Sequence, residues 1–253
     1  MGNRSVKKLC IAMIYLIPVI IFIGTLSKMY KVFWNVNACM SDYYLAVYDW
    51  KTVSFMGLFE MIYVSFVSIV IIKRNMTSNR IILYQSMGKM WWDCIKRGIL
   101  ITLLIPVVNC LIILLTALRE WAVFGCNWNV TGSLAKTWIP YHELVYENTF
   151  AVIVLMLLLD ILRLQIAYVL LCLLYWILRS AVWSFIIIYF NVLLLSIGKT
   201  GLFDRFVMYQ TDMYIYGISV FNNIVLPVII WAVCAAVSYL TCLLYTSDAA
   251  DEL

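Results

Sequence analysis

Six apolar stretches, each long enough to cross a lipid bilayer, dominate this sequence, and basic residues gather in alternate gaps between them. Hydrophobic residues make up 65% of the 253 residues, and charged residues make up only 12%. A soluble domain of this length could not bury so much apolar surface in one core. Inside a bilayer every backbone polar group must be hydrogen-bonded within the protein, so such stretches form helices. The sequence therefore predicts an all-α, polytopic membrane protein.

The expected transmembrane helices follow from length and apolar content. A helix needs roughly 20 mostly apolar residues to cross the hydrocarbon core of a bilayer. We predict six spans within one transmembrane domain (1–241), at about 9–27, 52–72, 99–118, 160–178, 181–197 and 217–240. Residues 179–180 are expected to form a tight turn between the fourth and fifth spans.

The fourth apolar tract is longer than a span requires, because it begins at Thr149 and ends at Leu178. It could be one steeply tilted helix. Alternatively, an external amphipathic segment at about 149–159 precedes the span. The second arrangement is favoured because it places Asp160 and Arg163 near the membrane surface, where a charged pair costs less.

The orientation follows from the distribution of lysine and arginine. With a cytoplasmic N-terminus, the cytoplasmic segments contain one acid, Asp93, and ten basic residues: Arg4, Lys7, Lys8, Lys73, Arg74, Arg80, Lys89, Lys96, Arg97 and Arg179. The segments on the other side contain seven basic and seven acidic residues. The sequence thus predicts a multi-pass protein of the plasma membrane with its N-terminus inside.

The last residues of the chain have a different character. The run CLLYTSDAADE within 242–253 resembles a translated sequencing adaptor, and it places three acidic residues on the side that is otherwise basic. We therefore expect residues 242–253 to be an artefactual tail.

Polar residues within the spans are candidates for function, because an ionisable group at membrane depth is costly. Glu60 lies near the middle of the second span, where it could bind a cation, relay a proton or form a structural hydrogen bond. The structural role is favoured. The other intramembrane polar residues are Asp160, Arg163, Asn191, Asn222 and Asn223. The three asparagines are expected to hydrogen-bond neighbouring helices.

The cysteine and histidine residues show no metal-binding spacing. Cys39 and Cys126 fall in the two long external segments, where an oxidising environment would allow a disulfide bond. No arrangement of acids, serine or histidine points to catalysis. We expect no catalytic residue, no metal, no cofactor and no nucleic-acid partner.

The segment between the second and third spans has the pattern of an amphipathic helix. Between residues 80 and 97, Tyr84, Met87, Trp91 and Cys94 recur at three- and four-residue spacing, and charged residues occupy the other faces. A basic amphipathic helix with tryptophans either lies on an anionic membrane surface or binds a groove of a partner protein. Composition alone favours the membrane surface.

Two segments carry a resemblance to a known family. RIILYQSMGKMWWDCIKRGILITLL (Arg80–Leu104) combines a basic, aromatic helix with a span that follows directly. LCLLYWILRSAVWSFIIIYFNVLLL (Leu171–Leu195) contains two spans joined by a tight turn. In these features, and in its six spans with a cytoplasmic N-terminus, the chain resembles the permease subunits of type 2 ATP-binding-cassette exporters.

The resemblance implies that 80–97 is a coupling helix that binds a separate ATPase subunit, and that two identical or different permeases form a dimer. The residues contacting the ATPase would be Arg80, Tyr84, Met87, Lys89, Trp91, Trp92, Lys96 and Arg97. The chain has no GxxxxGK[ST] loop, so ATP would be bound by the partner. The expected function is that of the membrane-spanning permease subunit of an ATP-driven exporter.

Two other functions stay open. An ion- or proton-coupled carrier would use Glu60 and would need no ATPase. A membrane scaffold or sensor would transport nothing, and its basic segment would bind only anionic lipid.

Overall fold

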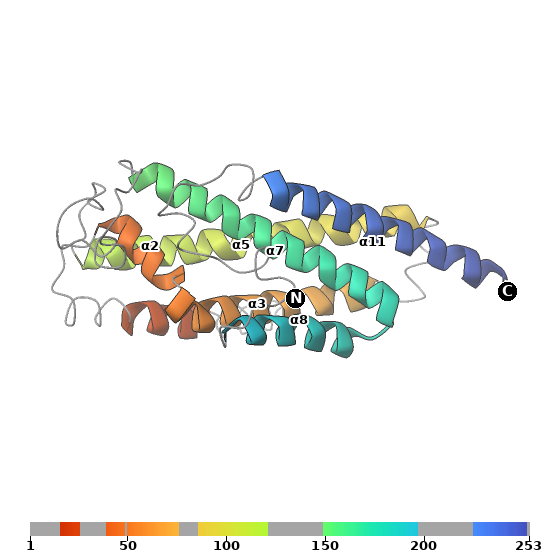
Figure 1. The fold of residues 1–253 in the computed structure, drawn as a ribbon, viewed down its shortest axis with the longest axis horizontal. Coiled ribbons are helices and arrows are strands. Elements are labelled where there is room, and N and C mark those ends of the chain that lie inside the picture. The colour runs from red at the N-terminus through yellow and green to blue at the C-terminus, as the bar shows by residue number, and fades with distance from the viewer. Residues whose placement is uncertain are drawn as a thin grey trace, which may run out of the picture. The chain divides into compact units, whose positions relative to one another are not determined.

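The computed structural model describes residues 16–25, 39–48, 50–75, 86–120, 149–196 and 225–251. All regular elements within these ranges are α-helices (Figure 1), which confirms the all-α class for this part of the chain. The first helix covers residues 16–25. It is followed by α2 (Met40–Tyr48), α3 (Trp50–Asn75), α5 (Met87–Arg119), α7 (Thr149–Leu178), α8 (Ala181–Ser196) and α11 (Leu226–Asp251).

Among the described residues, three helices are long and apolar enough to cross a membrane: Met87–Arg119, Ile153–Leu178 and Leu226–Leu244. Leu16–Thr25 and Ala181–Phe190 are shorter apolar helices. These helices are compatible with a membrane protein. The count of six spans and the orientation of the N-terminus stay predictions.

The chain divides into two compact units, and the division passes through α3, α5 and α7. The first unit contains the described residues before Gly57, together with 107–120 and 149–157. The second unit contains the remainder of α3, α5 and α7, together with α8 and α11. The sequence had predicted a single transmembrane domain, and no change in composition marks this division.

In the second unit, α7 is the most enclosed helix. Between Leu164 and Cys172 almost every side chain is buried, including large ones such as Tyr168. By contrast, α11 buries mainly a line of small residues, Ala235, Ser238 and Cys242, and exposes most of its other side chains. The sequence of α7 allows this enclosure because every residue of its C-terminal half except Gln165 is apolar or aromatic.

Two helices that the sequence divided into parts are continuous. Helix α5 joins the expected amphipathic segment to the third span without a break, and Pro106 lies inside it. Helix α7 likewise runs from Thr149 to Leu178 with no interruption at Asp160. Asp160 is buried, with only 3% of its surface exposed, rather than at the edge of the bundle. Both predicted arrangements, one tilted span or an external segment followed by a span, are compatible with a continuous α7.

The turn expected between the fourth and fifth spans is present and consists of Arg179 and Ser180. Arg179 has a positive φ of 51°, and its N–H donates to the carbonyl oxygen of Tyr175, 2.9 Å away. This left-handed residue ends α7. Ser180 then caps α8, because its Oγ accepts a hydrogen bond from the N–H of Trp183 (3.4 Å).

In the first unit, a local cap fixes the start of α2. The backbone N–H of Cys39 donates to Oδ2 of Asp42 at 2.9 Å, and the N–H of Asp42 donates to the carbonyl of Cys39 at 3.0 Å. Tyr43 follows on this helix. Burial, and then the negative charges of Glu120 and Asp42, raise the pKa of Tyr43 above its ordinary value.

Candidate functional site

The N-terminal part of α5 contains the described portion of the expected coupling helix, and its apolar stripe is already covered by the same chain. Met87, Trp91, Cys94 and Ile95 are all buried, and Trp91 is only 8% exposed. The helices that cover them are α11 and α7. The side chains of Met87 and Trp91, which the sequence placed in a contact with an ATPase, are thus buried within this chain.

Helix α11 covers one side of this stripe. The indole Nε1–H of Trp91 donates to Oγ of Ser238 at 3.1 Å, and the Trp91 ring meets the Tyr239 ring edge-on at 5.2 Å. One turn earlier, Sγ of Cys242 lies 3.9 Å from the carbonyl oxygen of Met87. Residue numbers rise along α5 as they fall along α11, so the two helices pack antiparallel.

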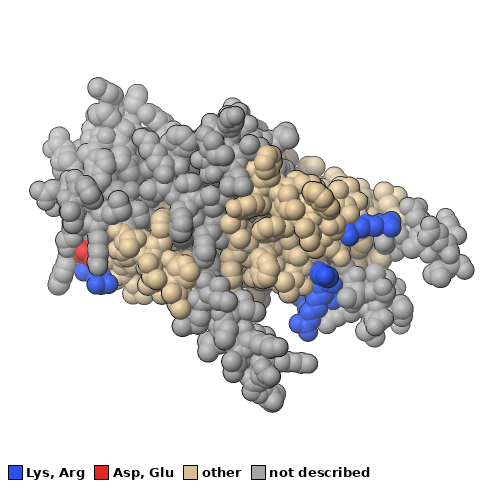
Figure 2. Space-filling view, turned by 90° about the horizontal axis from the view of Figure 1, so that it is seen from below, with Lys and Arg blue, Asp and Glu red and all other residues tan. Residues whose placement is uncertain are grey.

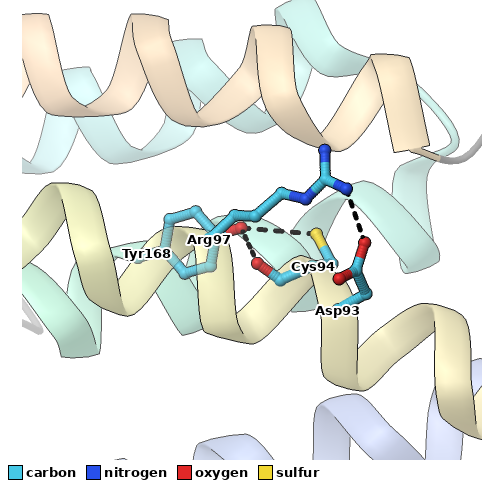
Figure 3. Close-up of polar contacts among 4 residues, drawn as sticks. All are labelled: Asp93, Cys94, Arg97 and Tyr168. Atoms are coloured by element: carbon cyan, nitrogen blue, oxygen red, sulfur yellow. Dashed lines mark hydrogen bonds and ion pairs between the residues drawn. The ribbon is translucent and has the colours of Figure 1, made fainter.

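Helix α7 covers the other side through Tyr168 (Figure 3). The Tyr168 hydroxyl donates to the backbone carbonyl of Cys94 at 2.7 Å and lies 3.3 Å from its Sγ. The Tyr168 ring lies against Gly98, where a Cβ atom would overlap three ring carbons. Only glycine at this position allows the two helices to approach so closely.

The Tyr168 hydrogen bond can be tested separately from the packing of its ring. In Tyr168→Phe, the ring remains and the carbonyl of Cys94 loses its side-chain donor. We expect a loss of about 0.5–1.5 kcal/mol of stability, measured by thermal unfolding of the purified chain in detergent. An unchanged unfolding temperature would show that the hydroxyl makes no net contribution.

The opposite face of the same segment is exposed and carries its charge. Lys89, Trp92, Lys96 and Arg97 are exposed there, and Asp93 is partly exposed. Arg97 forms an ion pair with Asp93, with 2.8 Å between Nη2 and Oδ2 (Figure 3). Nζ of Lys96 lies over the Trp92 ring, 5.5 Å from its centroid, in the geometry of a cation–π contact.

This exposed face changes character just after Gly98. Further along α5 the exposed side chains on the same side of the helix are leucines: Leu100, Leu103, Leu104, Leu111, Leu115 and Leu118. An exposed row of leucines is stable in lipid and unfavourable in water. This change is the pattern of a helix that passes from a membrane surface into the hydrocarbon core.

Other exposed basic residues of the second unit lie at the same end. Lys73 and Arg74 close α3, and Arg179 lies in the turn between α7 and α8. These helix ends and the start of α5 are all at the right of Figure 1. In Figure 2 lysine and arginine appear at the right-hand end of the described surface, basic atoms beside acidic ones appear at its left-hand end, and the tan surface between carries no charge.

The remaining expected site residues are dispersed or lie outside the described part of the chain. Glu60 in α3 is 2% exposed and interacts with a neighbouring group, as do Asp160 and the partly buried Arg163. Cys39 is buried with its Sγ 2.9 Å from Oγ of Ser41. Outside the described residues lie Arg80, Tyr84, Cys126, Asn222, Asn223 and the side chain of Asn191. A Cys39–Cys126 disulfide stays a prediction.

Sequence reasoning missed the residues that hold this segment in place, namely Gly98, Tyr168 and Ser238. A signal was present for Gly98, because Cys94, Gly98 and Thr102 repeat small residues every four positions, a spacing typical of close helix packing in membranes. No signal pointed to Tyr168, which is one of 17 tyrosines.

The chain matches no protein-family model, no curated protein and no solved structure.

Proposed function

We propose that this chain is the membrane-spanning permease subunit of an ATP-driven exporter of the plasma membrane, working as a dimer with a separate ATPase. The proposal includes six spans and a cytoplasmic N-terminus. The observation that carries it is the continuity of α5 from the charged segment into the membrane. At 1.5 Å per residue, its 33 residues extend about 50 Å, well beyond a hydrocarbon core of about 30 Å.

A continuous helix fixed at its outer end can transmit movement into the membrane. The outer part of α5 contacts α11 through Trp91 and α7 through Gly98. A displacement applied at the start of α5 would therefore move these three helices together instead of bending a loop. Transmission of this kind is what coupling to an ATPase requires.

The contact with the ATPase belongs at the beginning of α5 and in the segment that precedes it. Lys89 is exposed and lies nine residues before Gly98, about 13 Å along the helix. The headgroup layer on each side of a bilayer is only about 5–8 Å thick. Lys89 is therefore accessible to a soluble partner, and its charge would attract an acidic groove.

The test is charge reversal at Lys89 in the chain purified from its native membranes. Wild type should retain a subunit that hydrolyses ATP, measured as phosphate release. In Lys89→Glu we expect at least about a fivefold loss of that activity, because one close ion pair becomes a repulsion. The matched control is Lys73→Glu, which reverses an exposed charge at the end of α3. Absence of ATP hydrolysis from wild-type preparations, or equal loss in both variants, would contradict the proposal.

The burial of Glu60 favours one other candidate, an ion- or proton-coupled carrier. In that case Glu60→Gln would abolish solute uptake in vesicles that contain the chain and no ATPase. Retained uptake in this variant would exclude the carrier.

A further inference from the structure

The exposed face of α5 is charged at one end and apolar at the other, as a phospholipid molecule is. Trp92 is 51% exposed at one end of this face and Leu100 is 60% exposed two turns further along. Leu103 and Leu104 continue the apolar surface. On this face Trp92 and the charged side chains lie before Gly98 and leucines lie after it, so the face passes from a charged and aromatic part to a purely apolar part along a single helix.

Of the cations on this face that lie next to the leucines, only Lys96 is without a carboxylate partner among the described residues. Arg97 is neutralised by Asp93, which lies 2.8 Å away. Nζ of Lys96 lies over the Trp92 ring, 5.5 Å from the ring centroid. An ammonium group in this position can bind an anion without first giving up another ion pair.

The depth of Lys96 matches that of a lipid phosphate. Lys96 precedes Leu100 by four residues, about 6 Å along the helix. This distance falls within the headgroup layer of about 5–8 Å. Trp92 lies one turn further out, about 12 Å from Leu100 along the helix, and the ammonium group of Lys96 lies over its ring.

We propose that Trp92 and Lys96 bind the phosphate group of an anionic phospholipid, whose acyl chains lie along Leu100, Leu103 and Leu104. The occupant is a lipid because the apolar part of the face is continuous with the cation. A soluble acidic protein would contact Lys96 but could not cover leucines inside the membrane. The site is independent of the proposed ATPase contact, which lies further out at Lys89.

The experiment measures lipid retained by the full chain purified in detergent, with neither ATPase nor ATP present. Native mass spectrometry after addition of phosphatidylglycerol or phosphatidylcholine gives the preference for the anionic lipid. Wild type should prefer phosphatidylglycerol, and Lys96→Gln should lower that preference about fivefold, the effect expected for one cation at a membrane surface. Trp92→Ala should lower it about two- to fivefold, and Trp92→Phe less, because a ring remains.

The matched control is Arg119→Gln, an exposed cation at the opposite end of α5, which should leave the preference unchanged. All these side chains are exposed, and an unchanged elution volume in gel filtration verifies that each variant is folded. Equal retention of both lipids by wild type would overturn the proposal. Equal losses in Lys96→Gln and Arg119→Gln would overturn it too, since they would show general charge attraction. So would a Lys96→Gln variant that keeps the lipid preference of wild type, because Lys96 would then not bind the phosphate group.

Discussion

Replacing Gly98 with alanine is expected to be among the most damaging single changes in this chain. The added Cβ would overlap three carbons of the Tyr168 ring. That ring cannot easily move away, because Tyr168 is buried on α7 and its hydroxyl donates a hydrogen bond to the carbonyl of Cys94. Overpacking of a tight contact costs about 1–3 kcal/mol. We expect the upper end of this range, and so a fall of about 5–10 °C in the unfolding temperature, measured by thermal unfolding in detergent.

Two further variants show whether the Tyr168 ring is the cause. Gly24→Ala makes the same chemical change in another apolar helix where nothing lies within 4 Å of the new Cβ, so it should leave stability nearly unchanged. Tyr168→Ala creates space beside Gly98. Its combination with Gly98→Ala should therefore be less destabilising than the sum of the two single changes. Additive effects, or equal damage from Gly24→Ala, would contradict the contact.

The second large effect is expected from the neighbouring tryptophans Trp91 and Trp92, which were both expected to contact the ATPase. Trp91→Ala removes a buried ring together with its hydrogen bond to Ser238 and its edge contact with Tyr239. Truncation of a buried tryptophan costs about 3–5 kcal/mol. Trp92→Ala removes a ring that is half exposed and should change stability by only about 0.5 kcal/mol.

Thermal unfolding of both variants, with expression levels compared in membranes, gives a direct contrast between adjacent positions. We expect Trp91→Ala to unfold at a clearly lower temperature and Trp92→Ala to behave like wild type. If Trp91→Ala instead retained full stability and only lost a partner protein, Trp91 would belong to an intermolecular surface. The packing against α11 would then be wrong.

The fold class could be predicted from sequence because apolar length alone forces helices in a bilayer. The turn at Arg179 and Ser180 could also be predicted from sequence, since two long apolar runs leave only those two residues between them. The continuity of α5 could not be predicted. A change from amphipathic to apolar composition suggests a boundary in the sequence, but it does not interrupt hydrogen bonding within a helix.

The candidate site could be predicted only in part, for a related reason. Helical periodicity correctly grouped Met87, Trp91 and Cys94 on one face of the segment. Periodicity does not say whether such a face meets another molecule or the same chain. The answer depends on contacts that are distant in the sequence. Ser238 is 147 residues from its partner Trp91, and Tyr168 is 74 residues from its partner Cys94. The exposed pair of Trp92 and Lys96 likewise became distinct only once the other face was covered.

The distance along the chain between Trp91 and Ser238 has a consequence for how the protein is made. A ribosome adds about 5–20 residues per second, so the 147 residues between them take roughly 7–30 seconds to synthesise. Throughout that interval the stripe on α5 lacks the helix that later covers it. Assembly of this end of the bundle therefore has to wait for α11, and a nascent chain stopped before Ser238 would present Trp91 to lipid, to chaperones or to proteases.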